Sequence, residues 1–202
     1  MGIHSLKGRL VEEMVAVALA ILGLVVAGCG SSNSSTASNS NASSTEAQSA
    51  AQGDIPDNQV FLRYQNPQAG YSIKYPEGWA QKGSGNIVTF ADKGNSVKIA
   101  VTKGAAPTVA SVSAELKQEA AKDPTLKPGT PQQMKVGSNQ AVHVVYHLQG
   151  PPDPVTGKKP TLMVDRYVLA NKGNVATVDQ SSPVGVDNVD AYRLIIESFQ
   201  WS

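Results

Sequence analysis

Hydrophobic and polar positions divide the chain into three parts with different patterns. An apolar run occupies residues 14–27, and residues 30–53 are almost all Ser, Asn, Ala, Thr, Gln and Gly. In residues 54–202, apolar side chains recur with the periods of strands and helices, and all of the aromatic residues lie at or after Phe61. This pattern predicts one folded domain over residues 54–202.

Most of this domain carries the alternation or the β-branched runs that are typical of strands. In residues 70–75, Tyr71, Ile73 and Tyr75 point to one face and the polar residues between them point to the other. The predicted strands are residues 60–65, 70–75, 86–90, 97–102, 133–136, 140–148, 161–170 and 174–179. The third and fourth of these are expected to pair as a hairpin, and so are the sixth and seventh.

Two segments instead carry apolar residues at helical spacing. In the first, Thr108 or Ser111 is a suitable N-cap, and Asp123-Pro124 ends the helix. The second covers residues 187–199, with Asp187 as its expected N-cap. Strands with a middle helix and a terminal helix predict an α+β fold, an antiparallel β-sheet flanked by helices.

Two segments of the domain resemble a known family. GYSIKYPEGW at residues 70–79 is similar to the opening strand and turn of PsbP-like domains, and YRLIIESF at residues 192–199 is similar to their last helix. The resemblance extends over residues 55–202 and implies a PsbP-like α-β-α sandwich. Family members include the extrinsic PsbP subunit of photosystem II and bacterial lipoproteins, and a nuclear-import factor shares the fold. The resemblance implies protein–protein docking without catalysis, but no photosystem-binding or metal-binding residue of the family can be matched to a position here.

Residues 1–28 have the features of a lipoprotein signal peptide. Lys7 and Arg9 form a basic region, and the apolar run after them has about 14 residues, short of the ~20 that a membrane-spanning helix needs. The run ends in Val26-Ala27-Gly28-Cys29, which resembles a bacterial lipobox. Cys29 is the only cysteine, and its thiol is the predicted site of lipidation. The alternative interpretation is a buried free cysteine in an apolar helix.

A lipid anchor at Cys29 would be followed by a flexible connection. Residues 29–53 bury too little apolar surface to offset the loss of chain entropy, so we expect a disordered Ser/Asn-rich linker. Its end-to-end distance as a Gly/Ser-like coil is roughly 25–30 Å. The predicted location is the outer face of the cytoplasmic membrane, or the outer membrane if the host has one, with the lipids on Cys29 as the membrane contact.

Composition and motifs argue against several classes of function. The net charge is +1 and charged residues are 16% of the chain, without basic runs, which argues against nucleic-acid binding. A single cysteine excludes a disulfide scaffold and a Cys-rich metal site. The sequence has no Gly-rich phosphate loop, His-Glu-x-x-His, Gly-x-Ser-x-Gly or EF-hand motif. We therefore expect no catalytic residue, no bound metal and no cofactor.

His143 and His147 are the one histidine pair of the predicted domain. Both lie in one strand, where four residues span roughly 13 Å, whereas zinc needs about 2 Å to each nitrogen. They cannot share one ion. His147 could reach Asp165 across the predicted hairpin; the alternative interpretation is that both histidines are ordinary exposed sheet residues.

The loop of residues 149–160 is the candidate binding surface. It is longer than common hairpin loops, and Lys158 and Lys159 could meet an acidic partner or anionic lipid headgroups. The alternative is a solvated connection between two strands.

These observations predict a membrane-anchored extracytoplasmic lipoprotein whose non-catalytic PsbP-like domain binds or scaffolds another protein. It could instead be an accessory subunit of a membrane complex, photosynthetic if the host is. A small hydrolase or ligand-binding enzyme is the alternative from a different class. A deep pocket with converging polar groups would favour that alternative, whereas a flat or loop-dominated surface would favour docking.

Overall fold

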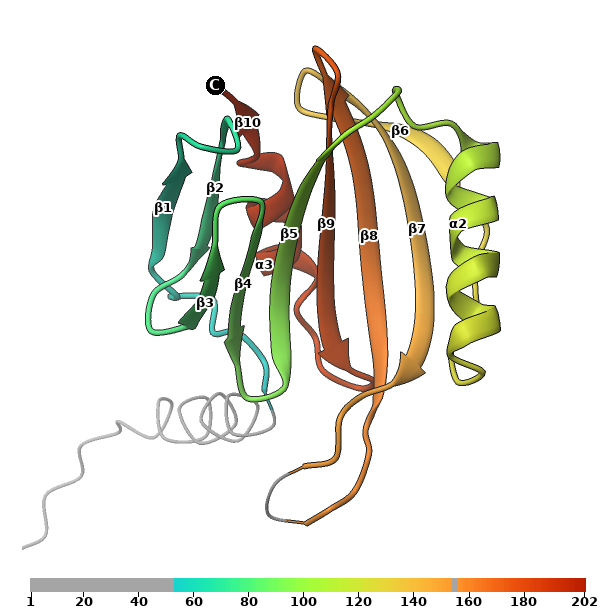
Figure 1. Ribbon diagram of the computed structural model, residues 1–202. Helices are drawn as coiled ribbons and strands as arrows, with labels where there is room; N and C mark the ends of the chain where they lie inside the picture. Colours follow the sequence, from blue (N-terminus) through green and yellow to red (C-terminus); the bar gives the residue numbers. More distant parts are fainter. Residues whose placement is uncertain (1–52, 154–155) are drawn as a thin grey trace, which may run out of the picture. The chain divides into compact units, whose positions relative to one another are not determined.

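The computed structural model describes residues 53–153 and 156–202 (Figure 1). The predicted signal peptide, Cys29 and the linker up to residue 52 lie outside the described residues. The strands are β1 (Phe61–Asn66), β2 (Tyr71–Pro76), β3 (Ala80–Ser84), β4 (Ile87–Asp92), β5 (Asn95–Lys103), β6 (Gln132–Val136), β7 (Asn139–Gln149), β8 (Thr161–Asn171), β9 (Asn174–Pro183) and β10 (Gln200–Trp201). The helices are α2 (Val109–Lys122) and α3 (Val189–Glu197).

The strands form two antiparallel sheets rather than the single sheet that the sequence predicts. The larger sheet has the order β3-β4-β5-β9-β8-β7-β6, and the smaller one has the order β1-β2-β10. Both predicted hairpins are present, as β4–β5 and β7–β8. The sequence analysis does not predict β3, because all of its residues are exposed and none supplies an apolar alternation.

The elements stack in layers with the larger sheet in the middle (Figure 1). α2 covers β7 and β8 on one face, where Val112 and Leu116 pack with Val144 and Val168 in one buried cluster. α3 and the smaller sheet cover the other face, where Ile195 joins a second cluster with residues of both sheets. The predicted α+β fold, with helices on both sides of an antiparallel sheet, is confirmed.

α2 begins and ends where the sequence predicts. Thr108 Oγ1 accepts the N–H of Ser111 at 3.0 Å, and the Ser111 hydroxyl oxygen accepts the N–H of Thr108 at 2.9 Å. This reciprocal capping satisfies two N–H groups that have no partner within the helix. Asp123 ends the helix, directly before Pro124.

α3 is shorter than predicted and begins differently. Asn188, and not Asp187, occupies the N-cap position. The Asn188 side chain accepts the N–H of Ile55 at 2.7 Å instead of bonding within the helix. The N–H of Asp187 donates to Asp54 Oδ1 at 3.0 Å. These bonds attach the first residues of the domain to the start of α3.

The hairpin turns explain how the central strands keep their register. Lys93-Gly94 joins β4 to β5 and Lys172-Gly173 joins β8 to β9. All four residues have positive φ, with 47° and 84° in the first turn and 48° and 78° in the second, as a type I′ turn requires. The second turn fixes Asp165 of β8 directly opposite Gln180 of β9.

Candidate functional site

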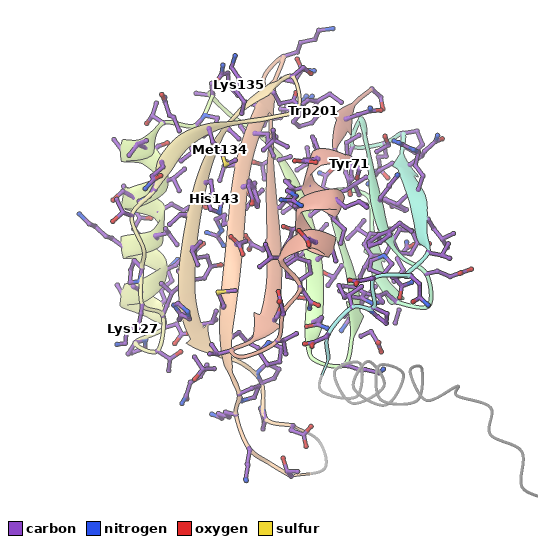
Figure 2. All side chains as sticks on the ribbon, turned by 180° about the vertical axis from the view of Figure 1, so that it is seen from behind. Tyr71, Lys127, Met134, Lys135, His143 and Trp201 are labelled. Atoms are coloured by element: carbon purple, nitrogen blue, oxygen red, sulfur yellow. The ribbon has the colours of Figure 1, made fainter. Side chains whose placement is uncertain are left out.

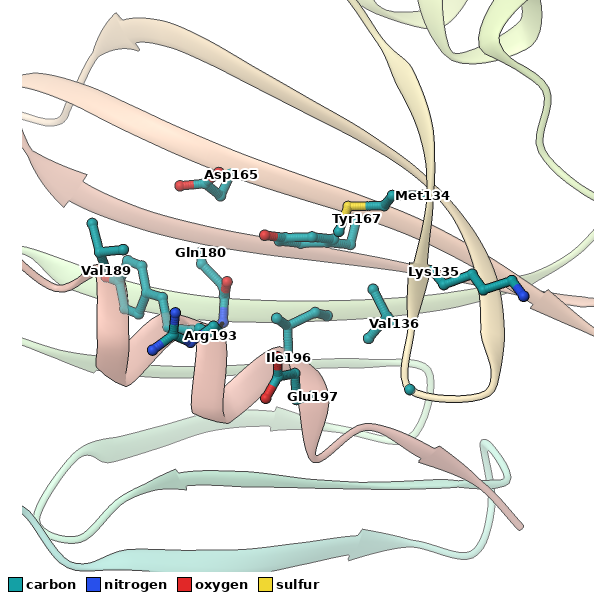
Figure 3. Close-up of a pocket in the computed structure, with 12 residues that line it drawn as sticks. Met134, Lys135, Val136, Asp165, Tyr167, Gln180, Val189, Arg193, Ile196 and Glu197 are labelled. Atoms are coloured by element: carbon teal, nitrogen blue, oxygen red, sulfur yellow. Dashed lines mark hydrogen bonds between the residues drawn. The ribbon is translucent and has the colours of Figure 1, made fainter.

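A groove of about 520 Å³ lies between α3 and part of the larger sheet (Figure 3). This volume is in the range of small-ligand pockets. Side chains from β6, β8, β9 and α3 line it, and they include apolar, charged and neutral polar groups. The groove is therefore a candidate binding site that the sequence analysis does not predict.

One wall of the groove is a single face of α3. Val189, Tyr192, Arg193, Ile196 and Glu197 recur at spacings that bring them to one side of a helix. Tyr192 and Ile196 are buried, whereas Val189 is 65% exposed and the two charged residues are exposed. The wall is therefore apolar toward the protein core and charged toward solvent.

The floor of the groove comes from the sheet. Because side chains alternate along a strand, Asp165 and Tyr167 face the groove while Arg166 between them faces α2. His143 of β7 lies opposite Tyr167, and the two rings stack with their centroids 4.5 Å apart. His143 Nε2 donates to Asp165 Oδ1 at 2.9 Å, since a carboxylate oxygen can only accept.

The environment of Tyr167 keeps its phenol protonated. Burial is the main cause that raises its pKa to about 12, and the negative charges of Asp165 and Glu197 add to the effect. Burial also raises the pKa of Tyr192 to about 12, and its hydroxyl donates to the Ser181 carbonyl at 2.6 Å. At neutral pH the Tyr167 hydroxyl can therefore accept or donate a hydrogen bond within the groove.

Gln180 carries the buried polar group of the groove that lacks a partner. Its side chain is 1% exposed, and its Nε2 donates to the Tyr192 carbonyl at 2.8 Å. That bond fixes the orientation of the amide. In the part of the chain that the structure describes, no donor reaches the other end, Oε1. A buried acceptor without a donor is unfavourable by about 1–3 kcal/mol. Gln180 Oε1 is one of four such buried side-chain atoms among the described residues, together with the Tyr71 hydroxyl oxygen, Asn95 Oδ1 and Trp201 Nε1.

Asp165 bonds to His143 and not to His147, the histidine considered from the sequence. Asp165 lies opposite Val145, so His143 and His147 are its two diagonal neighbours. The twist of the sheet shortens one diagonal relative to the other, and the hydrogen bond forms with His143. His147 is exposed and its backbone bonds to Lys127. Describing both histidines as ordinary exposed residues therefore fits His147 only. Figure 2 shows His143 below Met134 on the face of the sheet seen from behind.

Lys158 and Lys159 lie outside the groove. Both are exposed in the loop that extends beyond the ends of β7 and β8 (Figure 1). Asp153 Oδ1 organises this loop by accepting the N–H of Thr156 at 2.7 Å and its hydroxyl at 2.8 Å. The lysines thus remain a predicted binding surface, separate from the groove, and the predicted lipidation site at Cys29 lies outside the described residues.

A buried ion cluster on the opposite face of the sheet is also missed by the sequence analysis. Arg166 bonds both oxygens of Asp179 at 2.7 and 2.9 Å, and both oxygens of Glu119 on α2 at 3.0 and 2.9 Å. It also donates to the Tyr146 hydroxyl at 3.0 Å. Burial lowers the pKa of Arg166, but Asp179, Tyr146 and Glu119 outweigh burial and hold it above its ordinary value. The cluster attaches α2 to the sheet, and a signal for it is the position of Arg166 between the buried Val164 and Val168.

The described residues contain no further sign of a reaction centre. Within residues 53–153 and 156–202, no group of three or more His, Cys, Asp or Glu side chains is placed to bind a metal. The described lining of the groove includes carboxylates, phenols and an amide, but no serine, threonine or cysteine. Over the same ranges, neither helix combines the length and the apolar character that crossing a bilayer requires.

The fold of the domain is similar to that of a solved structure. No family model and no curated protein matches this chain. The solution structure of cyanobacterial PsbP (CyanoP) from Synechocystis sp. PCC 6803 matches with a TM-score of 0.55 and 16% identity, over 74% of this chain and 98% of CyanoP. A crystal structure from Bacteroides thetaiotaomicron VPI-5482 matches with a TM-score of 0.47 and 15% identity over 69% of this chain. This chain spans 48% of that protein.

The domain has a PsbP-like fold, as the resemblance of residues 70–79 and 192–199 implies. These two segments pack on each other. Tyr71 stacks on Phe199 with ring centroids 5.6 Å apart, and the N–H of Lys74 donates to Ser198 Oγ at 2.7 Å. The two segments that resemble the family therefore pack on each other inside the domain. Because their role is structural, they indicate the fold and not the function.

Proposed function

We propose that this protein is a lipoprotein, anchored through lipids on Cys29 at the outer face of the cytoplasmic membrane, or at the outer membrane where the host has one. Its PsbP-like domain follows a Ser/Asn-rich linker and binds or scaffolds another protein without catalysing a reaction. The alternative is an accessory subunit of a membrane complex, photosynthetic if the host is.

The groove beside α3 is the observation that supports a binding role. Val189 is 65% exposed and Met134 is 37% exposed, beside the half-buried Asp165 and the buried Gln180. An apolar rim around a few oriented polar groups is typical of recognition sites. Burying that rim in a complex would add a favourable hydrophobic contribution, and the polar groups would select the partner.

The anchoring proposal rests on the N-terminal sequence. Small residues precede Cys29, and a polar segment follows it. Two or three acyl chains, at roughly 0.8 kcal/mol per buried methylene, hold a protein stably on a membrane, which one chain alone does not.

A small hydrolase or ligand-binding enzyme is the competing proposal, and the groove supports it in so far as it is a pocket in which several polar groups converge. The His143–Asp165 pair is the kind of arrangement that orients a general base. However, Nε2 of His143 is already used by Asp165, and the described lining offers no hydroxyl or thiol of Ser, Thr or Cys for it to activate. These features support binding over acyl transfer.

The anchor is tested by labelling cells with an alkyne fatty acid and separating membranes from soluble protein. Cys29→Ser should abolish the label and release the protein or block its processing. Ser32→Ala, in the linker that follows, is the matched control and should behave as wild type. A Cys29→Ser protein that keeps its label, processing and membrane retention would contradict the proposal.

The partner is tested with a photo-crosslinking amino acid at Val189 in whole membranes. The matched control places it at Ile87, which is 55% exposed on β4 and does not line the groove. We expect a discrete protein adduct from position 189 only, and its identity distinguishes a single partner from a subunit of a larger complex. Equal adducts from both positions, or no adduct from position 189, would refute docking at the groove.

A further inference from the structure

We propose that the groove beside α3 binds a primary ammonium group that carries a short apolar chain. Such a group occurs as a lysine side chain on a partner protein and as a free alkylamine. The inference goes beyond the proposed function, because it concerns the chemistry of the groove and is independent of lipid anchoring.

The floor of the groove carries a hydrogen-bond acceptor that has no donor among the described residues. Gln180 Oε1 accepts nothing from the described residues, and its amide cannot turn over without breaking the bond to the Tyr192 carbonyl. Figure 3 shows the Gln180 oxygen on the side of the groove that faces Tyr167. A ligand that satisfies this oxygen must present an N–H or O–H group.

Negatively charged side chains also line the groove near that oxygen. Asp165 lies directly opposite Gln180 in the sheet, so two oxygen acceptors are neighbours on one face. His143 uses Asp165 Oδ1, which leaves Oδ2 available to a ligand. The charges of Asp165 and Glu197 both raise the pKa of Tyr167, so both carboxylates act on the same phenol. A positive donor at this place would satisfy the acceptors and offset their mutual repulsion.

Arg193 and Lys135, the two positive side chains of the lining, are directed away from the floor of the groove. Arg193 Nη2 lies 2.6 Å from Asp190 Oδ1, one turn earlier on α3. Lys135 extends away from the other labelled side chains of the groove (Figure 3). Arg193 and Lys135, the two positive residues that line the groove, therefore do not neutralise Asp165 at its floor, whose partner is His143.

The shape of an alkylammonium group fits these surroundings. It offers three N–H donors, and the acceptors of the groove include Gln180 Oε1, the Asp165 carboxylate and the Tyr167 hydroxyl oxygen. Its apolar chain would lie against Ile196, which is 3% exposed, and against Met134, whose flexible thioether adapts to irregular ligands. A neutral alcohol offers only one donor and no charge, and a carboxylate would be repelled.

The experiment titrates the full-length protein in detergent with three isosteric probes: 3-methylbutylamine, 3-methylbutanol and 3-methylbutanoate. Tyrosine labelled with ¹³C at Cζ and methionine labelled at the methyl carbon report binding at Tyr167 and Met134 by NMR. Tyr146, on the opposite face of the sheet, is the internal control. We expect saturable shifts with the amine, affinity about tenfold weaker for the alcohol, and no shift with the carboxylate.

Two isosteric substitutions test the role of charge. Glu197→Gln changes an exposed residue, and Asp165→Asn preserves the shape of the floor; each should weaken amine binding several-fold and leave alcohol binding unchanged. Glu115→Gln, on the exposed side of α2, is the matched control and should bind as wild type. Because Glu197 is exposed, its variant keeps the test valid even if a substitution at the half-buried Asp165 disturbs folding.

The source of the ammonium group is distinguished by adding Nα-acetyl-lysine N-methylamide as a fourth probe. Tighter binding of this derivative than of 3-methylbutylamine indicates a lysine side chain of a partner, and weaker binding indicates a free amine. The proposal is overturned if the alcohol or the carboxylate binds as tightly as the amine, if no probe shifts Tyr167, or if neither charge substitution weakens amine binding. None of these results bears on Cys29, so failure here leaves the anchoring proposal separately testable.

Discussion

Replacing Arg166 with methionine tests whether the buried ion cluster holds α2 on the larger sheet. Methionine retains most of the apolar stem and removes the guanidinium, and with it the bonds to Asp179, Glu119 and Tyr146. Removing one partner of a buried ion pair typically destabilises a protein by about 3–5 kcal/mol, because the other charge stays buried. The Asp179 side chain is 17% exposed and that of Glu119 is 34% exposed, so Asp179 should account for most of the effect. We expect Arg166→Met to lower the free energy of unfolding by about 3 kcal/mol.

Further variants separate two causes of this destabilisation: the carboxylate left without a partner and the hydrogen bonds lost with the guanidinium. Glu119→Gln should lose about 1 kcal/mol, since the amide oxygen still accepts a hydrogen bond and the group is partly solvated. Adding Asp179→Val to Arg166→Met should recover at least half of the loss, because no charge is then left buried beside the sheet. Lys117→Met, on the exposed side of α2, makes the same change without the cluster and should stay within about 0.5 kcal/mol of wild type.

Urea unfolding followed by circular dichroism gives the free energies, and hydrogen exchange locates the effect. In Arg166→Met the amides of α2 should exchange faster, while those of β1 and β2, which pack in the other buried cluster, should change less. The reasoning would be refuted if Arg166→Met lowered the free energy of unfolding by less than about 1 kcal/mol. It would also fail if the second substitution recovered nothing, since the loss would then not arise from an unpaired carboxylate.

Three further outcomes follow from the structure. The Tyr167 pKa, read from its ¹³Cζ shift, should be about 12, and Asp165→Asn should lower it while burial keeps it above 10; an unchanged value would contradict the contribution of that charge. Since the folded pKa exceeds the unfolded value of about 10, the contribution of this phenol to stability is complete below pH 10 and is lost between about pH 10 and 12. Lys158→Glu with Lys159→Glu should change stability by only about 0.5 kcal/mol but reduce recovery of a crosslinked partner, and wild-type recovery would identify the loop as a solvated connection. Removing residues 1–52 should shift the melting temperature by no more than a few degrees, and a larger shift would mean that the domain begins earlier.

Local patterns were sufficient to predict most elements of the fold. The alternation of β2, the runs of β7 and β8, and the capped stripe of α2 each depend on residues close in sequence, and each is present. The division into two sheets depends on which distant strands pair, and Gln200-Trp201 joins β2 only because α3 returns the chain to Tyr71. A strand of exposed Gln, Lys, Gly and Ser residues such as β3 has no hydrophobic signal, because its backbone pairing with β4 alone holds it in the sheet.

The groove depends on where one strand ends, and the hydrophobic pattern of the sequence does not determine that boundary to within a few residues. The sequence analysis ends the last long strand at Asp179, whereas β9 continues to Pro183. That short extension places Gln180 on the same face as Ala176 and Val178, at a position that the alternation reserves for an apolar residue. A polar side chain held there must be satisfied by its own neighbours or by a ligand, and the bond to the Tyr192 carbonyl satisfies only its nitrogen. The same reasoning applies to Arg166, which also takes an apolar position, but its donors all find carboxylates or a phenol. Two polar residues at core positions thus have opposite outcomes: the satisfied Arg166 attaches α2 to the sheet, and the half-satisfied Gln180 supports the proposal that the groove binds a ligand.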